Sequence, residues 1–166
     1  MSLYSLPEKA YALAYENEQK YGSCPQCVLA AIHDTFGIAS DDVIKAGHAL
    51  AGGGALAGDG MCGALTGGIL ALGCQFGRER KDFGKRNLKS FEVARKLRDR
   101  FVAEYEGITC HSVQKKIFGK TFNLWDKDEY KAFNDAGGHT DKCPAVAGNV
   151  AKWVAEILLA EGVSPK

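Results

Sequence analysis

Cysteine followed directly by proline occurs twice in the chain, each time in front of an apolar run with helical spacing. Cys24-Pro25 leads into VLAAI, and Cys143-Pro144 leads into the run that ends the chain. Proline fits the first turn of a helix because the N–H group that it lacks would have no partner there. Both pairs therefore predict helix starts, with the cysteine at the N-cap position.

Two further cysteines are also predicted at helix starts. Cys62 follows the glycine-rich loop AGGGALAGDGM at 51–61, and Cys110 follows Thr109, a residue type that caps helices. A helix N-terminus carries about half a positive charge and free N–H donors, and both favour a thiolate over a thiol. Thiolate is the form that binds metals and reacts. We therefore expect low pKa values at all four helix-start cysteines.

The rest of the chain has helical periodicity almost throughout and no useful run of β alternation. It predicts an all-α, single-domain compact helical bundle over residues 1–166 with a glycine-rich loop, its helices starting near residues 6, 24, 41, 62, 86, 110, 127 and 143. The helix at about 86–106 is expected to bury one apolar face, formed by Phe91, Ala94, Leu97, Phe101 and Val102. The basic stretch 78–100 is interpreted as the solvated face of a helix.

Composition narrows the class of protein. Of 166 residues, 46% are hydrophobic and 25% charged, and 21 Lys and Arg nearly balance 20 Asp and Glu, so no bulk field attracts nucleic acid or an anionic membrane. The first twenty residues lack a signal-peptide pattern, and no stretch is expected to span a bilayer. A cytoplasmic location is therefore predicted. In that reducing compartment, six cysteines suggest metal ligands, redox-active thiols or small core residues rather than disulfides.

The other chemistry-bearing residues give weaker patterns. Cys24 and Cys27 form a C-x-x-C at a helix start, as in dithiol proteins, but without their βαβ context. Cys74 is expected to be a small buried residue. A zinc site could be formed by Cys110, His111, His139 and Cys143. The spacing of these residues matches no usual zinc signature. Trp125 and Tyr130 are expected to be packing residues.

The glycine-rich loop raises the question of nucleotide binding. Residues 58–63 fit G-x-G-x-x-G by letter, but no strand precedes them and no Gly-Lys-Ser/Thr follows. The dinucleotide and P-loop interpretations both fail for lack of that context. A steric role is favoured instead: Gly60, Gly63, Gly67 and Gly68 allow backbone or a neighbouring helix to approach closely around Cys62.

The order of Cys24, CGALTG at 62–67, Cys110 and Cys143 resembles a family of redox-active proteins named for a C-GCAxxG-C-C pattern. The likeness covers roughly residues 20–160. A related domain of split-Soret cytochromes c is associated with an iron–sulfur centre. The resemblance implies an iron–sulfur cluster, most simply [2Fe–2S], with Cys24, Cys62, Cys110 and Cys143 as ligands. Cys27 and Cys74 depart from the family pattern.

Three functions are compatible with these observations. The first is an iron–sulfur protein for electron transfer or redox sensing, an electron carrier rather than a defined enzyme, since four thiolates suit such a cluster. The second is a cluster-free thiol–disulfide protein, with Cys24 attacking and Cys27 or Cys143 resolving. The third is a zinc-stabilised module that binds a protein. We expect a redox partner protein and neither nucleic acid nor membrane, and a homo-oligomer is left open.

Overall fold

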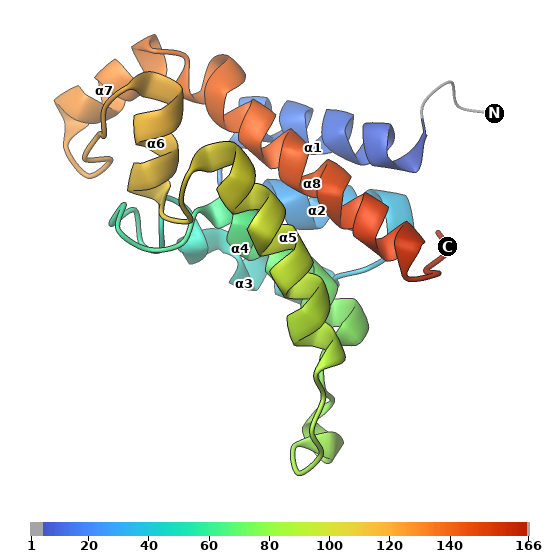
Figure 1. Ribbon diagram of the computed structural model, residues 1–166. Coiled ribbons are helices and arrows are strands. Elements are labelled where there is room, and N and C mark those ends of the chain that lie inside the picture. Colours follow the sequence, from blue (N-terminus) through green and yellow to red (C-terminus); the bar gives the residue numbers. More distant parts are fainter. Residues whose placement is uncertain (1–4, 166) are drawn as a thin grey trace.

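The computed structural model describes residues 5–165 and is built from helices (Figure 1). No strand occurs among those residues, so the predicted all-α fold is confirmed. The α-helices are α1 Leu6–Tyr21, α2 Cys24–Phe36, α3 Asp41–Ala46, α4 Gly63–Phe76, α5 Lys89–Tyr105, α6 Cys110–Phe118, α7 Lys127–Asp135 and α8 Cys143–Ala160. Three short turns complete the set: 3-10 turns at His48–Leu50 and Arg80–Asp82, and a π-helical turn at Gly138–Lys142.

The long C-terminal helix α8 organises the hydrophobic core. It lies alongside α1 and also packs on α2, α4 and α5 (Figure 1). The apolar run predicted after Cys143-Pro144 is buried at helical spacing, at Val150, Val154, Ile157 and Leu158. The period of 3.6 residues therefore located the core face of this helix correctly.

The π-helical turn and α8 together form a helix, Gly138–Ala160, that is long and apolar enough to cross a membrane. On that criterion the sequence prediction is wrong, because no stretch was expected to qualify. However, 56% of the apolar window is buried inside the protein, which is how the core helix of a globular fold behaves. Its hydrophobicity is accounted for by packing.

Helix α4 approaches its neighbours closely because two adjacent glycines face them. A Cβ atom on Gly67 would lie 2.6 Å from the carbonyl oxygen of Pro25 in α2. One on Gly68 would lie 2.7 Å from both Leu97 in α5 and Val150 in α8. The steric role predicted for these glycines is confirmed, since any side chain would force the helices apart.

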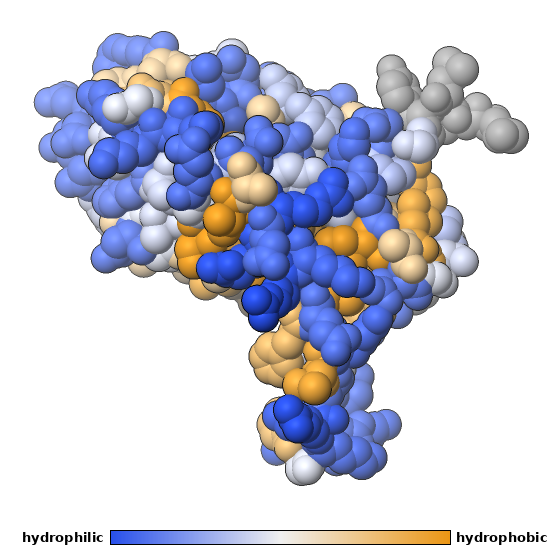
Figure 2. All heavy atoms as spheres, viewed as in Figure 1, coloured by the Kyte–Doolittle hydropathy of each residue, from blue (hydrophilic) through white to orange (hydrophobic). Residues whose placement is uncertain are grey.

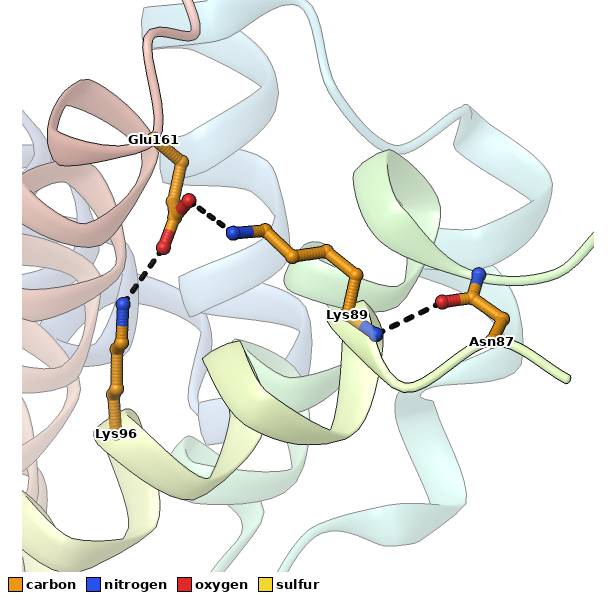
Figure 3. Close-up of polar contacts among 4 residues, drawn as sticks. All are labelled: Asn87, Lys89, Lys96 and Glu161. Atoms are coloured by element: carbon orange, nitrogen blue, oxygen red, sulfur yellow. Dashed lines mark hydrogen bonds and ion pairs between the residues drawn. The ribbon is translucent and has the colours of Figure 1, made fainter.

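Helix α5 is held against the end of α8 by charged residues as well as by its apolar face. Glu161, just after α8, binds both Lys89 and Lys96, the latter at 2.7 Å (Figure 3). Arg100 of α5 also lies 2.7 Å from Glu156 of α8. The apolar face is rotated from the predicted one. The buried residues are Val93, Leu97, Phe101 and Tyr105.

Phe91 was expected in that buried face and is instead 71% exposed. The expectation that residues 78–100 form one solvated helix is also wrong, because 77–88 form an extended connection that projects from the body (Figure 1). The connection contains a 3-10 turn at Arg80–Asp82. Its surface is mainly polar (Figure 2), so it has little apolar area to bury in the core. Gly77 ends α4 in an extended conformation, and a Cβ atom there would meet the Gly73 carbonyl oxygen.

A pair of glycine substitutions in α4 tests the close packing. Gly67→Ala should lower the free energy of unfolding by about 1–3 kcal/mol, because its Cβ meets the backbone of α2. Gly73→Ala is the matched control, since nothing lies within 4 Å of that Cβ and the site is exposed. It should raise the free energy of unfolding by about 0.5–1 kcal/mol through helix propensity. Urea unfolding of both variants checks this, and equal effects would contradict tight α2–α4 packing.

Candidate functional site

The four predicted cysteines all lie at helix starts. Cys62 is the N-cap residue of α4, whereas Cys24, Cys110 and Cys143 are the first residues of α2, α6 and α8. The N-cap prediction for Cys24 and Cys143 is therefore off by one position. At α2 the N-cap is Ser23, in a left-handed conformation, and at α8 it is Lys142, which ends the π-helical turn.

Cys62 and Cys110 are brought together by two antiparallel segments rather than by helix packing. The Cys62 N–H donates to the Ile108 carbonyl at 2.7 Å, and the Cys110 N–H donates to the Gly60 carbonyl at 3.0 Å. Met61 and Thr109 form the bridge between these two bonds. Thr109 also accepts from the Ser112 N–H and so caps α6 as predicted.

Cys24 meets Cys62 where the starts of α2 and α4 touch. The residue after Cys62 is Gly63, and a Cβ atom there would lie 2.5 Å from the Cys24 sulfur. Glycine is needed at this position because a side chain would occupy the space that the sulfur fills. The Cys-Gly order in the sequence is therefore a direct requirement of the Cys24–Cys62 approach.

Cys143 reaches the same region from the C-terminal helix. The π-helical turn before it is fastened to α1, where Gln19 Nε2 donates to the Thr140 carbonyl at 2.6 Å. Burial raises the pKa of Cys143 well above its usual range, and the nearby Glu18, Cys62 and Cys110 raise it further, so these groups lie within electrostatic reach of Cys143.

Among the four cysteines, Cys62 has the most favourable environment for a thiolate. Its pKa is lowered because Cys24 donates a hydrogen bond to its sulfur and because the Ala64 and Leu65 N–H groups at the start of α4 do the same, against the effect of burial. The hydrogen bond to Cys62, together with burial, raises the pKa of Cys24 well above its usual range. The four cysteines therefore favour one thiolate, held at Cys62.

The expectation of four low-pKa thiolates is wrong for three of them. Burial raises the pKa of Cys110 to about 12 and that of Cys143 well above the usual range, and the charge of Cys62 adds to both effects. The free-energy cost of removing a thiolate from water exceeds the stabilisation that a helix N-terminus provides. Only Cys62, with three hydrogen-bond donors at its sulfur, overcomes that cost.

All four cysteines line one cavity of about 780 Å³. Part of its wall is apolar and aromatic, including Leu56 and Leu124. Trp125 also belongs to the wall, although it is 72% exposed and not the packing residue that was expected. Its indole N–H donates to the Ala55 carbonyl at 2.8 Å, which fastens α7's leading loop to the glycine-rich loop. Tyr130, also predicted to be a packing residue, lines the cavity and is 42% exposed.

Glu18 is a site residue that the sequence analysis missed. It is 2% exposed, lines the cavity, and its Oε2 atom has no hydrogen-bond partner. Burial raises its pKa to about 7, and the neighbouring Cys27 side chain opposes this increase. The signal was available, because Ala10, Ala14 and Glu18 follow one another at intervals of four on the buried face of α1.

His139 lies next to Glu18, with Nε2 3.8 Å from Glu18 Oε1. Its Nδ1 atom is 3.0 Å from Asn134 Oδ1, so Nδ1 carries the proton that this oxygen accepts. Burial lowers the pKa of His139. The neutral ring therefore presents the lone pair of Nε2 towards Glu18.

The other candidate residues lie elsewhere. Cys27 is buried, its thiol donates to the Gly22 carbonyl at 2.9 Å, and burial raises its pKa. Cys74 is exposed, so the prediction that it is buried is wrong: the last turn of α4 extends beyond the core. Within residues 5–165, no three His, Cys, Asp or Glu side chains are grouped closely enough to hold a single metal ion, which includes the proposed set of Cys110, His111, His139 and Cys143.

The raised pKa of Glu18 predicts how stability depends on pH. Between about pH 4.5 and 7 the folded protein keeps a proton that the unfolded chain has lost, so the free energy of unfolding falls as pH rises through this range. The Glu18→Gln variant should not show this decrease, because its amide does not titrate. The free energy of unfolding of the variant, relative to that of wild type, should increase by about 2–3 kcal/mol from pH 5 to pH 8.

Chemical unfolding at several pH values measures this difference, with the exposed Glu16 as the control position. Glu16→Gln should show no such increase. A stability difference for Glu18→Gln that stays constant from pH 5 to pH 8 would contradict the buried, protonated carboxyl.

Comparison with known proteins agrees with the cysteine arrangement. The model of the family described as "Putative redox-active protein (C_GCAxxG_C_C)" matches residues 22–157, which include all four site cysteines and the Cys62–Gly67 element. No curated protein and no solved structure gives a significant match. Because the match covers most of the chain, the protein belongs to the C_GCAxxG_C_C family of redox-active proteins.

Proposed function

We propose that this redox-active protein holds one iron–sulfur cluster on Cys24, Cys62, Cys110 and Cys143 and uses it for electron transfer or redox sensing. The observation that carries the proposal is that these four cysteines, distant in sequence, line one cavity and are electrostatically coupled through Cys62. When bound, such a cluster supplies one-electron redox chemistry.

The surroundings of the sulfurs fit such a group. Gly63 leaves the space next to the Cys24 sulfur free of a side chain. The Ala64 and Leu65 N–H groups donate to the Cys62 sulfur, and hydrogen bonds of this kind help to set a cluster's reduction potential. The high thiol pKa values of Cys24, Cys110 and Cys143 mean that binding must release protons, so affinity should increase with pH.

An iron–sulfur cluster and a single zinc ion use their ligands differently. One tetrahedral zinc requires its ligands around a single point, whereas an iron–sulfur cluster distributes its four thiolates over two or more iron atoms and a set of sulfides. Among residues 5–165, no group of three candidate ligands is arranged to hold a metal ion, and this finding includes the four site cysteines. Binding of either group would therefore require the sulfurs to move, and the metal content of the protein decides between the two.

The contact between Cys24 and Cys62 supports a second candidate function, a cluster-free dithiol. Cys62 has the lowered pKa needed for attack, and Cys24, its hydrogen-bond donor, is the adjacent sulfur. The Cys62 thiolate would attack a disulfide substrate, and Cys24 would then attack the mixed disulfide and form a Cys24–Cys62 sulfur–sulfur bond. The substrate takes up two electrons, the Cys24 proton and one proton from solvent, and leaves as two thiols. The Cys24–Cys27 version is less favourable, since burial raises the pKa of Cys27.

Metal analysis of anaerobically purified protein tests the first proposal. We expect iron and acid-labile sulfide in equal amounts, with charge-transfer absorption in the visible range. Cys143→Ser should lose most of both, because one of four ligands is removed. Cys74→Ser is the matched control and should keep both, since Cys74 is exposed at the far end of α4.

The same preparations separate the alternatives. A folded, colourless protein with stoichiometric zinc would replace the cluster with a structural zinc site. A folded, metal-free protein in which Cys62 is alkylated fastest would favour the Cys24–Cys62 dithiol. Iron that survives Cys143→Ser unchanged would remove Cys143 from the ligand set.

The proposed chemistry also predicts a redox partner and a cellular location. An iron–sulfur carrier of this kind would exchange electrons with a partner protein. Thiols that must stay reduced suit a reducing compartment such as the cytoplasm.

A further inference from the structure

The cavity at the four cysteines has room for more than a small inorganic cluster. Its volume of about 780 Å³ lies in the range of roughly 300–1,000 Å³ that is typical of sites for organic molecules. A [2Fe–2S] core adds only four atoms to the cysteine sulfurs. Much of the cavity is therefore left for a second occupant, and its walls indicate what kind of molecule that is.

One part of the wall is apolar and aromatic. Leu56 comes from the glycine-rich loop, and Leu124, Trp125 and Phe133 come from α7 and the segment that precedes it. The hydrogen bond from Trp125 to the Ala55 carbonyl fixes these two segments to each other. Ala55 and Leu56 both have positive φ angles, 48° and 59°, a conformation that costs a non-glycine residue energy. The fold thus maintains a strained loop that places Leu56 at this wall.

Another part of the wall contains two buried polar atoms without a hydrogen-bond partner, next to a histidine. Glu18 Oε1 and His139 Nε2 face each other at 3.8 Å, and Glu18 Oε2 is buried without a partner. Since His139 uses its Nδ1 proton for Asn134, Nε2 offers only a lone pair. The Ser23 hydroxyl lines the same cavity and is also buried without a partner. Buried acceptors of this kind are costly unless a donor reaches them.

The charges around the cavity decide the sign of the donor. Burial raises the pKa of Glu18 to about 7, so above neutral pH its carboxylate places a negative charge in the cavity, with Oε2 lacking a hydrogen-bond partner. The other titratable groups of the lining are His48, His139, Tyr21, Tyr130 and Lys20. Lys20 is exposed to solvent, and burial disfavours the charged form of His139. A cation is therefore favoured over a neutral or anionic ligand.

We propose that the cavity binds a small organic ammonium ion with an apolar or aromatic body, next to the cysteine sulfurs. The N–H groups of a primary ammonium supply three donors, which match the acceptors at Glu18 and His139 and the Ser23 hydroxyl. The apolar body lies against Leu56, Leu124, Trp125 and Phe133. The inference concerns a second ligand in the same cavity and does not require that a cluster be present, since Glu18, His139 and Ser23 line the cavity without it.

Calorimetric titration with three probes of similar size tests this proposal: benzylammonium, benzyl alcohol and benzoate. At pH 8, where Glu18 is ionised, benzylammonium should bind at least about tenfold more tightly than either of the others. Glu18→Gln should weaken benzylammonium binding about tenfold and leave benzyl alcohol unchanged. Glu16→Gln, on the exposed side of the same helix, should change neither.

A second pair of variants keeps the test independent of the buried carboxyl. Trp125→Ala should weaken the binding of benzylammonium and of benzyl alcohol alike, because it removes part of the apolar wall. Phe91→Ala is its control, since Phe91 is equally exposed, at 71% against 72%, but lies outside this cavity. Both positions are exposed, so neither variant should unfold the protein.

Equal affinity for the three probes, or benzylammonium binding that survives both Glu18→Gln and Trp125→Ala, would overturn the proposal. Iron and sulfide are measured in the same samples. Iron present without probe binding leaves the cluster proposal standing and rejects the ammonium site. Probe binding with the expected variant pattern in an iron-free protein does the reverse.

Discussion

The close approach of helix α4 to the start of helix α2 is the constraint on which the rest of the structure depends. Gly63 and Gly67 lie one turn apart on α4, and each leaves room for an atom of α2 that a Cβ would displace: the Cys24 sulfur and the Pro25 carbonyl. This contact brings the first two cysteines together. The paired segments at 58–62 and 108–111 then fix Cys110, and the packing of α8 on α1 and α2 brings Cys143 to the same cavity. A cysteine-lined cavity assembled from distant segments exists only in the packed fold.

The chemistry of the site follows from a balance between burial and hydrogen bonding. Three cysteines share the helix-start position with Cys62, yet burial keeps their thiols protonated. Cys62 differs because two backbone N–H groups and the Cys24 thiol all donate to its sulfur. A helix start alone is therefore too weak to ionise a buried thiol, and several donors at one sulfur are needed. In the proposed cluster, the iron atoms would supply the positive charge that the other three sulfurs lack.

The sequence predicted the helices, the positions of the four cysteines and the steric role of the glycines, because proline, glycine and capping residues act locally. It could not predict which thiol is ionised, since that depends on the depth of burial. It misplaced Phe91 because the buried face of α5 is rotated from the predicted one, and it misplaced Cys74 because the last turn of α4 is exposed. Glu18 was missed because charged residues in a helix usually face water, whereas this one is buried next to Cys27 of α2 and His139 of the π-helical turn. The cavity itself has no local signature, since its walls come from five separate parts of the chain.

Anomalous diffraction at the iron absorption edge, from crystals of anaerobically isolated protein, tests the central claim most directly. The account predicts iron peaks inside the cavity, within bonding distance of the sulfurs of Cys24, Cys62, Cys110 and Cys143. Crystals of the same material that show the cavity free of iron, with Cys24 and Cys62 joined in a disulfide, would contradict it.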